Sequence, residues 1–442
     1  MQTSFTPTQL RDPDFASSEA VIRKCVHCGF CTATCPTYLL LGDELASPRG
    51  RIYLMKEMLE NEQEPTAEVV KHIDRCLSCL SCMTTCPSGV NYMHLVDHAR
   101  AYIQDHYERP LHDRLLRDLI ARTLPYPKRF RAALRLARLG RFMEGVFGRS
   151  GKTHALAAML RLAPRRVPKP APARNAPAVA ARRGRVVLLQ GCAESVLRPQ
   201  IREATVRLLT RTGFDVDFAK REACCGALKW HMGLRDDGLA QARHNVDVWR
   251  RELTQGLDGI VITASGCGTT IKDYGFMLRD DPAYAEDAAR ISTMAVDVTE
   301  LLFRSGLPAA RTAPALDVAY QAPCSMQHGQ SVQREPIELL AAAGFRVRQP
   351  QEAHICCGSA GTYNIFQPEL AGQLGDRKAV NLDRLKADVI ATGNIGCATQ
   401  IEGRAAAPVV HTVELLDWAT GGPCPVALAA VLTITKEDPC PS

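Results

Sequence analysis

The chain carries one cysteine pattern twice, as Cys25-Val-His-Cys-Gly-Phe-Cys-Thr-Ala-Thr-Cys-Pro36 and as Cys76-Leu-Ser-Cys-Leu-Ser-Cys-Met-Thr-Thr-Cys-Pro87. In each copy three cysteines stand two residues apart, and a fourth follows after three residues and precedes a proline. In all, 18 of the 442 residues are cysteine, too many to be incidental. The polar stretch from Met1 to Leu10 has no basic-then-apolar pattern of an export signal. We therefore expect a reducing compartment, where cysteines more often bind metals or react than form disulfides.

The spacing of both copies is the one with which bacterial ferredoxins bind [4Fe–4S] clusters. Three closely spaced thiolates can wrap one corner of a cubane, while the fourth points toward the neighbouring cluster. The ligand sets are therefore expected to be crossed: Cys25, Cys28, Cys31 and Cys86 for one cluster, and Cys76, Cys79, Cys82 and Cys35 for the other. Zinc sites usually combine two separated pairs of cysteines, so we favour two clusters over zinc or a disulfide set.

The second half of the chain contains an internal repeat of cysteines. In each copy a first cysteine is followed 32 residues later by Cys-Cys-Gly and then by Gly-Cys, and a Glu-Leu-Leu segment closes the unit at Glu300 or Glu414. Packing is the alternative role for such cysteines, because a free cysteine behaves as a small hydrophobic residue. The matched spacing instead favours metal or redox roles for Cys192, Cys224, Cys225 and Cys267 in the first copy and Cys324, Cys356, Cys357 and Cys397 in the second.

Short apolar runs precede these cysteines and indicate parallel strands. Residues 186–190 and 260–263 come before the outer cysteines of the first copy, and residues 318–321 and 389–392 occupy the same positions in the second. Alternation of such runs with longer amphipathic stretches is typical of α/β units. Ligands gather at the carboxyl ends of parallel strands, so we expect each set of cysteines at one sheet edge. His27, His231, His328 and His354 stand near cysteines and are expected to pack or to form hydrogen bonds.

The positive charge of the chain is concentrated in one segment. Residues 100–185 hold 21 Lys or Arg against 5 Asp or Glu, a local excess of 16, although the whole chain carries only +7. Apolar residues recur there at helical spacing: Leu134, Leu136, Leu139, Phe142, Met143 and Phe147. A solvated helical face, docking to a partner or membrane surface, and nucleic-acid binding are the three interpretations. Aromatic residues are sparse, so we expect no nucleic acid.

These observations predict an α+β multidomain chain, with a helical dicluster ferredoxin-like domain followed by two Rossmann-like α/β Cys-Cys-Gly domains. The expected boundaries are residues 1–105 for the first domain, 106–184 for a basic helical connector and proline-rich linker, and 185–310 and 311–425 for the two repeats. No uncharged apolar run reaches the ~20 residues of a membrane helix, so we expect a cytoplasmic chain, with peripheral attachment to the inner membrane left open.

Several local sequences carry a family resemblance. The first cysteine run, Ser47-Pro-Arg-Gly-Arg-Ile-Tyr-Leu54, Cys86-Pro-Ser-Gly-Val-Asn-Tyr-Met-His-Leu95 and Cys356-Cys-Gly-Ser-Ala-Gly-Thr-Tyr-Asn364 resemble the iron–sulfur subunits of bacterial glycolate oxidases. In the wider Cys-Cys-Gly family the repeats bind iron–sulfur clusters, in some members with five cysteines. Here Ala264 and Asn394 replace the fifth cysteine, so the type of any such cluster stays open.

The resemblance implies a function in electron transfer. An FAD-containing partner subunit would oxidise glycolate to glyoxylate, a second flavoprotein-like subunit would complete the complex, and this chain would pass electrons to a quinone-type acceptor. We expect no catalytic residue in the chain itself. The alternatives are an equivalent subunit of a lactate or glycerol 3-phosphate dehydrogenase, a catalyst that resembles heterodisulfide reductase, and an iron–sulfur protein that binds nucleic acid.

Overall fold

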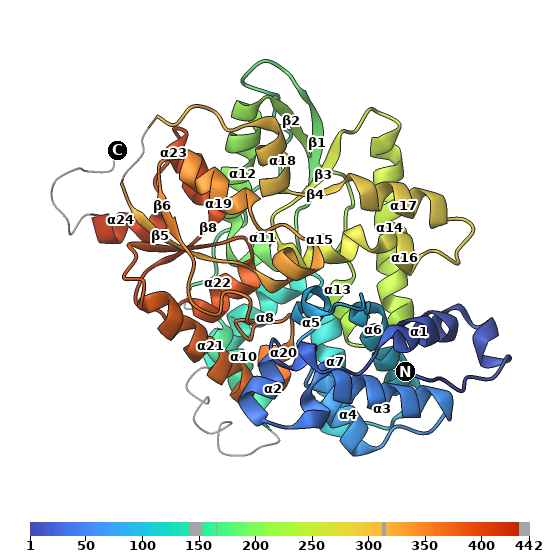
Figure 1. Cartoon of the computed structure of the whole chain (residues 1–442). Coiled ribbons are helices and arrows are strands. Elements are labelled where there is room, and N and C mark those ends of the chain that lie inside the picture. The colour runs from blue at the N-terminus through green and yellow to red at the C-terminus, as the bar shows by residue number, and fades with distance from the viewer. Residues whose placement is uncertain (141–152, 165, 312–314, 433–442) are drawn as a thin grey trace.

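The computed structural model describes residues 1–140, 153–164, 166–311 and 315–432. A helical N-terminal unit lies against two parallel sheets, each with its own helices (Figure 1). This mixed architecture confirms the predicted fold class. Among the described residues, no helix combines the length and the apolar character that crossing a bilayer requires.

The N-terminal unit consists of short helices around the two cysteine loops. Its elements are η1 (Gln9–Arg11), α1 (Pro13–Lys24), η2 (Phe30–Thr32), α2 (Pro36–Leu41), η3 (Glu44–Ala46), α3 (Pro48–Glu60), α4 (Ala67–Asp74), α5 (Ser81–Thr85) and α6 (Tyr92–His106). Proline begins α1, α2 and α3, at a position where its missing N–H costs nothing. The side chain of Ser47 caps α3 by accepting a hydrogen bond from the Gly50 N–H. One core of apolar side chains, including Ile22, Met55 and Leu95, joins α1, α3, α4 and α6.

Three further helices connect this unit to the sheets: α7 (Leu111–Thr123), α8 (Pro127–Gly140) and α10 (His154–Leu162). The helical spacing predicted for this segment is found in α7 and α8, whereas Phe142, Met143 and Phe147 lie outside the described residues. Between residues 166 and 183 the chain forms no helix, and Ala176 pairs with Val216 as an isolated antiparallel bridge.

The two sheets have the same strand order, β2-β1-β3-β4 and β6-β5-β7-β8, and every pair of strands is parallel. The strands of the first sheet are β1 (Gly184–Leu188), β2 (Phe214–Asp217), β3 (Gly259–Ile262) and β4 (Ala295–Asp297). Those of the second are β5 (Asp317–Gln321), β6 (Arg346–Arg348), β7 (Val389–Thr392) and β8 (Val409–His411). All four strands expected from the sequence are present, as β1, β3, β5 and β7, and the identical order confirms the internal repeat.

Helices cover the sheets and join them to each other. The first repeat contributes α11 (Glu194–Leu197), α12 (Pro199–Thr212), α13 (Ala227–His231), α14 (Arg235–Leu253), α15 (Ser265–Lys272), α16 (Tyr274–Met277), α17 (Ala285–Met294) and α18 (Val298–Ser305). The second contributes the π-helix η6 (Ser325–Gly329), α19 (Glu335–Ala342), α20 (Tyr363–Phe366), α21 (Pro368–Asp383), α22 (Ile395–Ile401), α23 (Thr412–Ala419) and α24 (Val426–Leu432). Because α12 packs on α23 and α18 packs on α19, one apolar core extends from Val186 to Val318 and joins both sheets.

The repeated Glu-Leu-Leu segments close matching capping boxes. Glu300 accepts a hydrogen bond from the Asp297 N–H at the start of α18, and Glu414 accepts one from the His411 N–H at the start of α23. His411 replaces the usual capping carboxylate, and burial lowers its pKa to about 4. The Val413 N–H donates to Nδ1 of His411, so Nε2 carries the proton and donates to the Thr263 carbonyl of the first repeat. The cap of one repeat therefore also binds the other.

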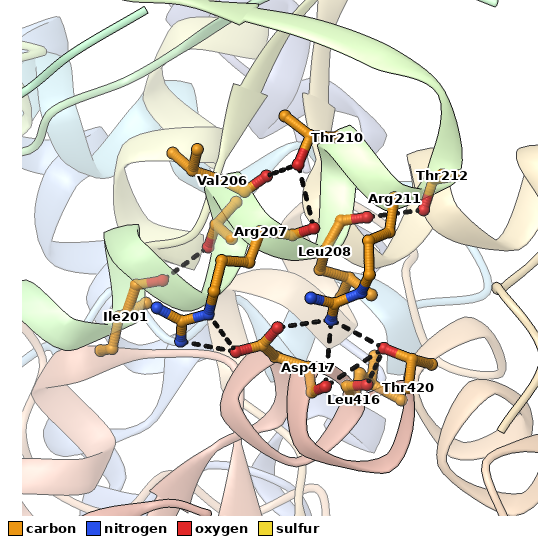
Figure 2. A network of polar contacts seen from close by, with 11 residues as sticks. Ile201, Val206, Arg207, Leu208, Thr210, Arg211, Thr212, Leu416, Asp417 and Thr420 are labelled. Carbon is orange, nitrogen blue, oxygen red and sulfur yellow. Dashed lines mark hydrogen bonds and ion pairs between the residues drawn. The ribbon is translucent and has the colours of Figure 1, made fainter. Parts of the chain in front are cut away.

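A buried carboxylate strengthens this contact between the repeats (Figure 2). Asp417 on α23 is 1% exposed and accepts hydrogen bonds from Arg207 and Arg211 on α12, at 2.6 Å and 2.5 Å. Arg211 also donates to the Asp417 carbonyl and to the Thr420 hydroxyl. Because both arginines share one buried acid, the two helices are fixed in position relative to each other.

Replacing Asp417 by asparagine is expected to lower the free energy of unfolding by about 2 kcal/mol, since two guanidinium groups lose their counter-charge. The expected loss of stability is smaller than for a fully buried ion pair because the Arg207 side chain is 38% exposed. Urea unfolding measures the change. Arg304→Ala, which removes an exposed partner of Glu300, is the control and should change stability by less than ~0.5 kcal/mol. Equal effects of the two substitutions would contradict the role given to Asp417.

Candidate iron–sulfur sites

The first hollow of the N-terminal unit is lined by Cys25, Cys28, Cys31 and Cys86, and has a volume of about 420 Å³. Cys82 from the other loop also reaches its wall. The structure thus brings together three cysteines of the first run and the last cysteine of the second. Cys28 is exposed, and its neighbours Val26 and Phe30 are 67% and 63% exposed. We call this hollow and its four cysteines site one.

A second hollow of about 330 Å³ is lined by Cys35, Cys76, Cys79 and Cys82. We call it site two. Cys35 and Cys79 are buried, in contrast to the exposed Cys28 of site one. Burial raises the pKa values of the Cys79 and Cys82 thiols well above the usual range. A metal centre that binds them as thiolates must therefore displace protons and supply a compensating positive charge.

The wall shared by the two hollows contains a buried hydroxyl, that of Tyr92. Tyr92 lines both hollows and is 3% exposed, and its hydroxyl has no hydrogen-bond partner in the part of the chain that the structure describes. Buried hydroxyls are normally paired, so an unpaired one facing thiols fits a bound group with acceptor atoms. The inorganic sulfides and thiolate sulfurs of an iron–sulfur cluster are such acceptors. In the sequence Tyr92 stands in a segment that resembles the family, but no spacing pattern there predicts a role for it.

Arg51 is a second residue of site two that sequence reasoning missed. It follows Arg49 by two positions on α3, and it is 1% exposed. Its guanidinium donates to the His72 carbonyl at 2.7 Å and to the Thr37 hydroxyl at 2.9 Å, and it lies 3.8 Å from the Cys35 sulfur. The signal available in the sequence was helical phase, since residues two apart on a helix point in different directions.

Each Cys-Cys-Gly repeat gathers its four predicted cysteines at the carboxyl edge of its sheet. In the first repeat Cys192 and Cys224 lie 3.6 Å apart, sulfur to sulfur, and in the second Cys324 and Cys356 have the same separation. Cys225 interacts with Cys267, and Cys357 interacts with Cys397. Each repeat therefore presents four thiols in one connected group. We call these groups the first-repeat and second-repeat sites.

The glycine after each cysteine pair is required by the backbone. Gly226 and Gly358 have φ angles of +89° and +86°, in the left-handed region that disfavours other residues. A Cβ atom at Gly358 would lie 2.6 Å from the Ala371 carbonyl oxygen, and one at Gly226 would lie 3.0 Å from the Gly238 carbonyl oxygen. These glycines let the cysteine loops turn tightly against α21 and α14.

The two repeats contact the N-terminal unit in different ways. Cys79 and Leu77 of site two share an apolar cluster with Cys356 and Tyr363 of the second repeat, and Cys324 packs against that cluster. The first repeat contacts α6 at Asp97, which accepts hydrogen bonds from Trp230 and His231, and through Phe276, whose ring stacks on His94. Site two thus adjoins the second-repeat site directly.

Two of the four histidines that stand near cysteines, His231 and His328, form side-chain hydrogen bonds. His231 lies 3.0 Å from Asp97, and His328 lies 2.8 Å from the Thr84 hydroxyl and 3.2 Å from the His354 carbonyl. His27 lines site one. Within the described ranges, no three His, Cys, Asp or Glu side chains converge as ligands of a single metal ion would. In a cubane each thiolate binds a different iron, so the relevant feature is a space surrounded by sulfurs.

Comparison with known proteins agrees with this layout. The family described as "4Fe-4S dicluster domain" matches residues 21–90, and the family described as "Cysteine-rich domain" matches residues 186–272 and 318–402. The chain is therefore a two-cluster protein of the [4Fe–4S] type with two cysteine-rich repeats.

Individual proteins resemble this chain over most of its length. The glycolate oxidase iron-sulfur subunit of Escherichia coli is 40% identical over 95% of this chain and 99% of its own length. A probable glycolate oxidase iron-sulfur subunit of Bacillus subtilis is 31% identical over 90% and 93%. Lactate utilization protein A of Bacillus licheniformis is 26% identical but covers only 53% of this chain. A solved hypothetical protein from Helicobacter pylori shares the fold, with a TM-score of 0.51 and 11% identity over 94% of this chain and 74% of its own.

The crossed ligand sets make a prediction about double variants. Cys86→Ser should cost about four irons per chain, the content of one cubane, and the double variant Cys25→Ser/Cys86→Ser should lose no more than either single variant. Cys76→Ser/Cys86→Ser should lose about eight, because it removes one ligand from each cluster. Iron analysis of anaerobically purified protein, with spectra of the reduced state, measures both.

Cys424→Ser is the control, because Cys424 lies outside all four groups of cysteines. Uncrossed sets would give the opposite result, in which Cys76 and Cys86 variants lose the same cluster and Cys25 and Cys86 variants lose different ones.

Proposed function

This chain belongs to the family of glycolate oxidase iron–sulfur subunits, and on that premise we propose that it carries electrons from a flavin-bearing partner that oxidises glycolate to glyoxylate toward a quinone-type acceptor. The observation that carries the proposal is the succession of neighbouring cysteine groups, from the exposed site one through site two to the second repeat. A second flavoprotein-like subunit would complete the complex.

A [4Fe–4S] cluster bound at site one or site two would take up and release one electron at a time. The chain's own residues would supply the ligands, exclude water from site two and keep the two sites in contact through Cys82 and Tyr92. Substrate chemistry belongs to the flavin partner in this proposal, so no residue of this chain is given a catalytic role.

Site one is proposed as the point where electrons enter. The exposed side chains of Val26 and Phe30 flank Cys28. Exposed apolar groups beside a redox site suit a protein partner that brings its flavin close. Site two has no such opening on the side of Cys79, where Leu77 and Tyr363 cover it.

Electrons are proposed to leave site two through the second repeat. Cys79 and Cys356 belong to one apolar cluster, so a centre held by the second-repeat cysteines would adjoin a cluster at site two. The first-repeat cysteines lie in a separate core with Trp249 and Tyr274. That repeat meets the second where Ser265 on α15 contacts Ser325 on η6, with 2.6 Å between the hydroxyl oxygens.

Glycolate is favoured over lactate by the length of the match and by sequence identity. Relatives named for glycolate oxidase align over at least 90% of this chain, whereas those named for lactate utilization cover 53%. Catalysis of the heterodisulfide reductase type is disfavoured because Ala264 and Asn394 occupy the fifth cysteine positions. The Asn394 side chain instead donates a hydrogen bond to the Cys397 sulfur at 3.5 Å.

The basic helices α7 and α8 are proposed to rest on an anionic membrane surface. Leu111, Leu115 and Leu119 form one exposed stripe on α7, and Leu136 and Leu139 on α8 are 69% and 72% exposed. Exposed basic side chains accompany them: Arg114, Arg122, Lys128, Arg129, Arg135 and Arg138. Apolar residues among cations suit a lipid surface with negative headgroups, where a quinone acceptor would also be found.

The relay can be tested by reconstitution with the flavin subunit, with glycolate as donor and a quinone analogue as acceptor. Cys25→Ser, Cys76→Ser and Cys356→Ser should each lower acceptor reduction at least tenfold, because each interrupts the proposed path. Cys224→Ser, the matching position in the first repeat, is the comparison for Cys356→Ser and should retain at least a third of the rate.

Acceptor reduction that survives Cys25→Ser or Cys76→Ser would contradict the relay. An equal loss in the two repeat variants would contradict only the preference for the second repeat. Flavin reduction by glycolate in the partner should be unchanged in every variant, which separates electron transfer from substrate oxidation.

The membrane proposal predicts that the full chain sediments with vesicles containing anionic lipid and less with neutral vesicles. Leu115→Glu/Leu119→Glu should weaken binding to anionic vesicles at least tenfold, by removing apolar contact and adding repulsion. Val179→Glu changes an even more exposed apolar residue outside α7 and α8, and this variant should bind vesicles as the parent chain does. Binding that is indifferent to the leucine substitutions or to lipid charge would refute this surface.

A further inference from the structure

The Arg51 guanidinium is buried without a carboxylate partner among the described residues. Its contacts are the His72 carbonyl, the Thr37 hydroxyl and the Cys35 sulfur, all of which are neutral when Cys35 is a thiol. A guanidinium stays charged in a protein, and an isolated buried charge costs several kcal/mol. The position is therefore stable only when a negative group lies close by.

Arg49, two residues earlier, provides a contrast within the same helix. Its guanidinium pairs with Glu44 at 2.5 Å, and its side chain is 31% exposed. It lines site one, whereas Arg51 lines site two. The chain thus compensates the arginine at site one with its own carboxylate and leaves the arginine at site two uncompensated.

The negative groups that face Arg51 are the cysteines of site two. Besides Cys35, Cys76 and Tyr92 interact electrostatically with the Arg51 guanidinium. A [4Fe–4S] centre with four thiolate ligands is an anion, and reduction adds one more negative charge. A cation fixed in a water-poor environment stabilises the more negative state most.

We propose that Arg51 is the buried counter-charge of the cluster at site two and that it raises the reduction potential of that cluster above the value the cysteines alone would give. This inference rests on the proposed function, which places a cluster at site two. Net charge and hydrogen bonds to sulfur are among the factors that set cluster potentials. With its own arginine paired to Glu44, site one lacks this effect, so electrons that enter there are drawn to site two.

A structural role for Arg51 is the competing explanation, because its hydrogen bonds join α2, α3 and α4. The two roles differ in what a substitution must preserve. A counter-charge needs the positive charge, whereas a brace needs the planar guanidinium and its directed hydrogen bonds. Lysine at position 51 keeps the positive charge and loses the planar guanidinium with its directed hydrogen bonds. Thr37→Val removes one hydrogen bond and leaves the charge in place.

The experiment is a potentiometric titration of the full chain, followed by electron paramagnetic resonance. Cys28→Ser first identifies which reduction wave belongs to site one, since Cys28 lines only that hollow. Arg51→Gln should then lower the equilibrium constant for one-electron reduction at site two at least tenfold, which is 59 mV. The equilibrium constant for one-electron reduction at site one should change less than threefold. Arg51→Lys, Thr37→Val and the control Arg49→Gln should leave site two within threefold of the parent.

Loss of the site-two iron in Arg51→Gln but not in Arg51→Lys would also support a counter-charge. Both variants lose the guanidinium, and only Arg51→Lys keeps a positive charge. An unchanged site-two wave in Arg51→Gln would overturn the inference, as would equal shifts in Arg51→Lys or Thr37→Val. Parent protein that holds no iron at site two would overturn the proposed function itself, and iron analysis shows this before any variant is made.

Discussion

Cys79 takes part in two structures at once. Its sulfur lines the second cysteine-lined hollow of the N-terminal unit, and its side chain lies in the apolar cluster with Cys356 and Tyr363 of the second repeat. One buried loop therefore joins a ferredoxin-like unit to an α/β unit. The two cysteine runs are also tied to each other. Cys35 of the first run lines the hollow of the second run, and Cys86 of the second run lines the hollow of the first.

The two Cys-Cys-Gly repeats have the same fold but make different contacts with the N-terminal unit. Both sheets have the same strand order and the same sulfur–sulfur separation of 3.6 Å at their edges. The first repeat meets the N-terminal unit at Asp97, whereas the second meets it through the apolar cluster around Cys79 and a hydrogen bond between His328 and Thr84. The contacts between repeats, through Asp417 and His411, hold these different surfaces in place.

Much of this arrangement could be predicted from the sequence, because cysteine spacing and short apolar runs are local signals. The four expected strands are present. Each N-terminal set of four cysteines lines one hollow, and the four cysteines of each repeat are connected by contacts between their side chains. Arg51 escaped prediction because a buried arginine and a surface arginine look alike in a sequence. Arg49 and Arg51 differ only in the direction that each side chain takes from α3. His411 escaped for a related reason, since an imidazole that caps a helix carries no spacing signal of its own.

The two hollows differ in how far the rest of the chain covers them, and this difference bears on how each would acquire a cluster. Cys28 stays exposed in the folded chain, so its hollow is accessible from solvent after folding. Cys79 lies beneath Tyr363 and Cys356, which come from a part of the chain synthesised more than 270 residues later. Its hollow is best filled before the C-terminal repeat folds down on it. A cluster at this hollow would therefore have to enter before residues 356–363 pack over Cys79.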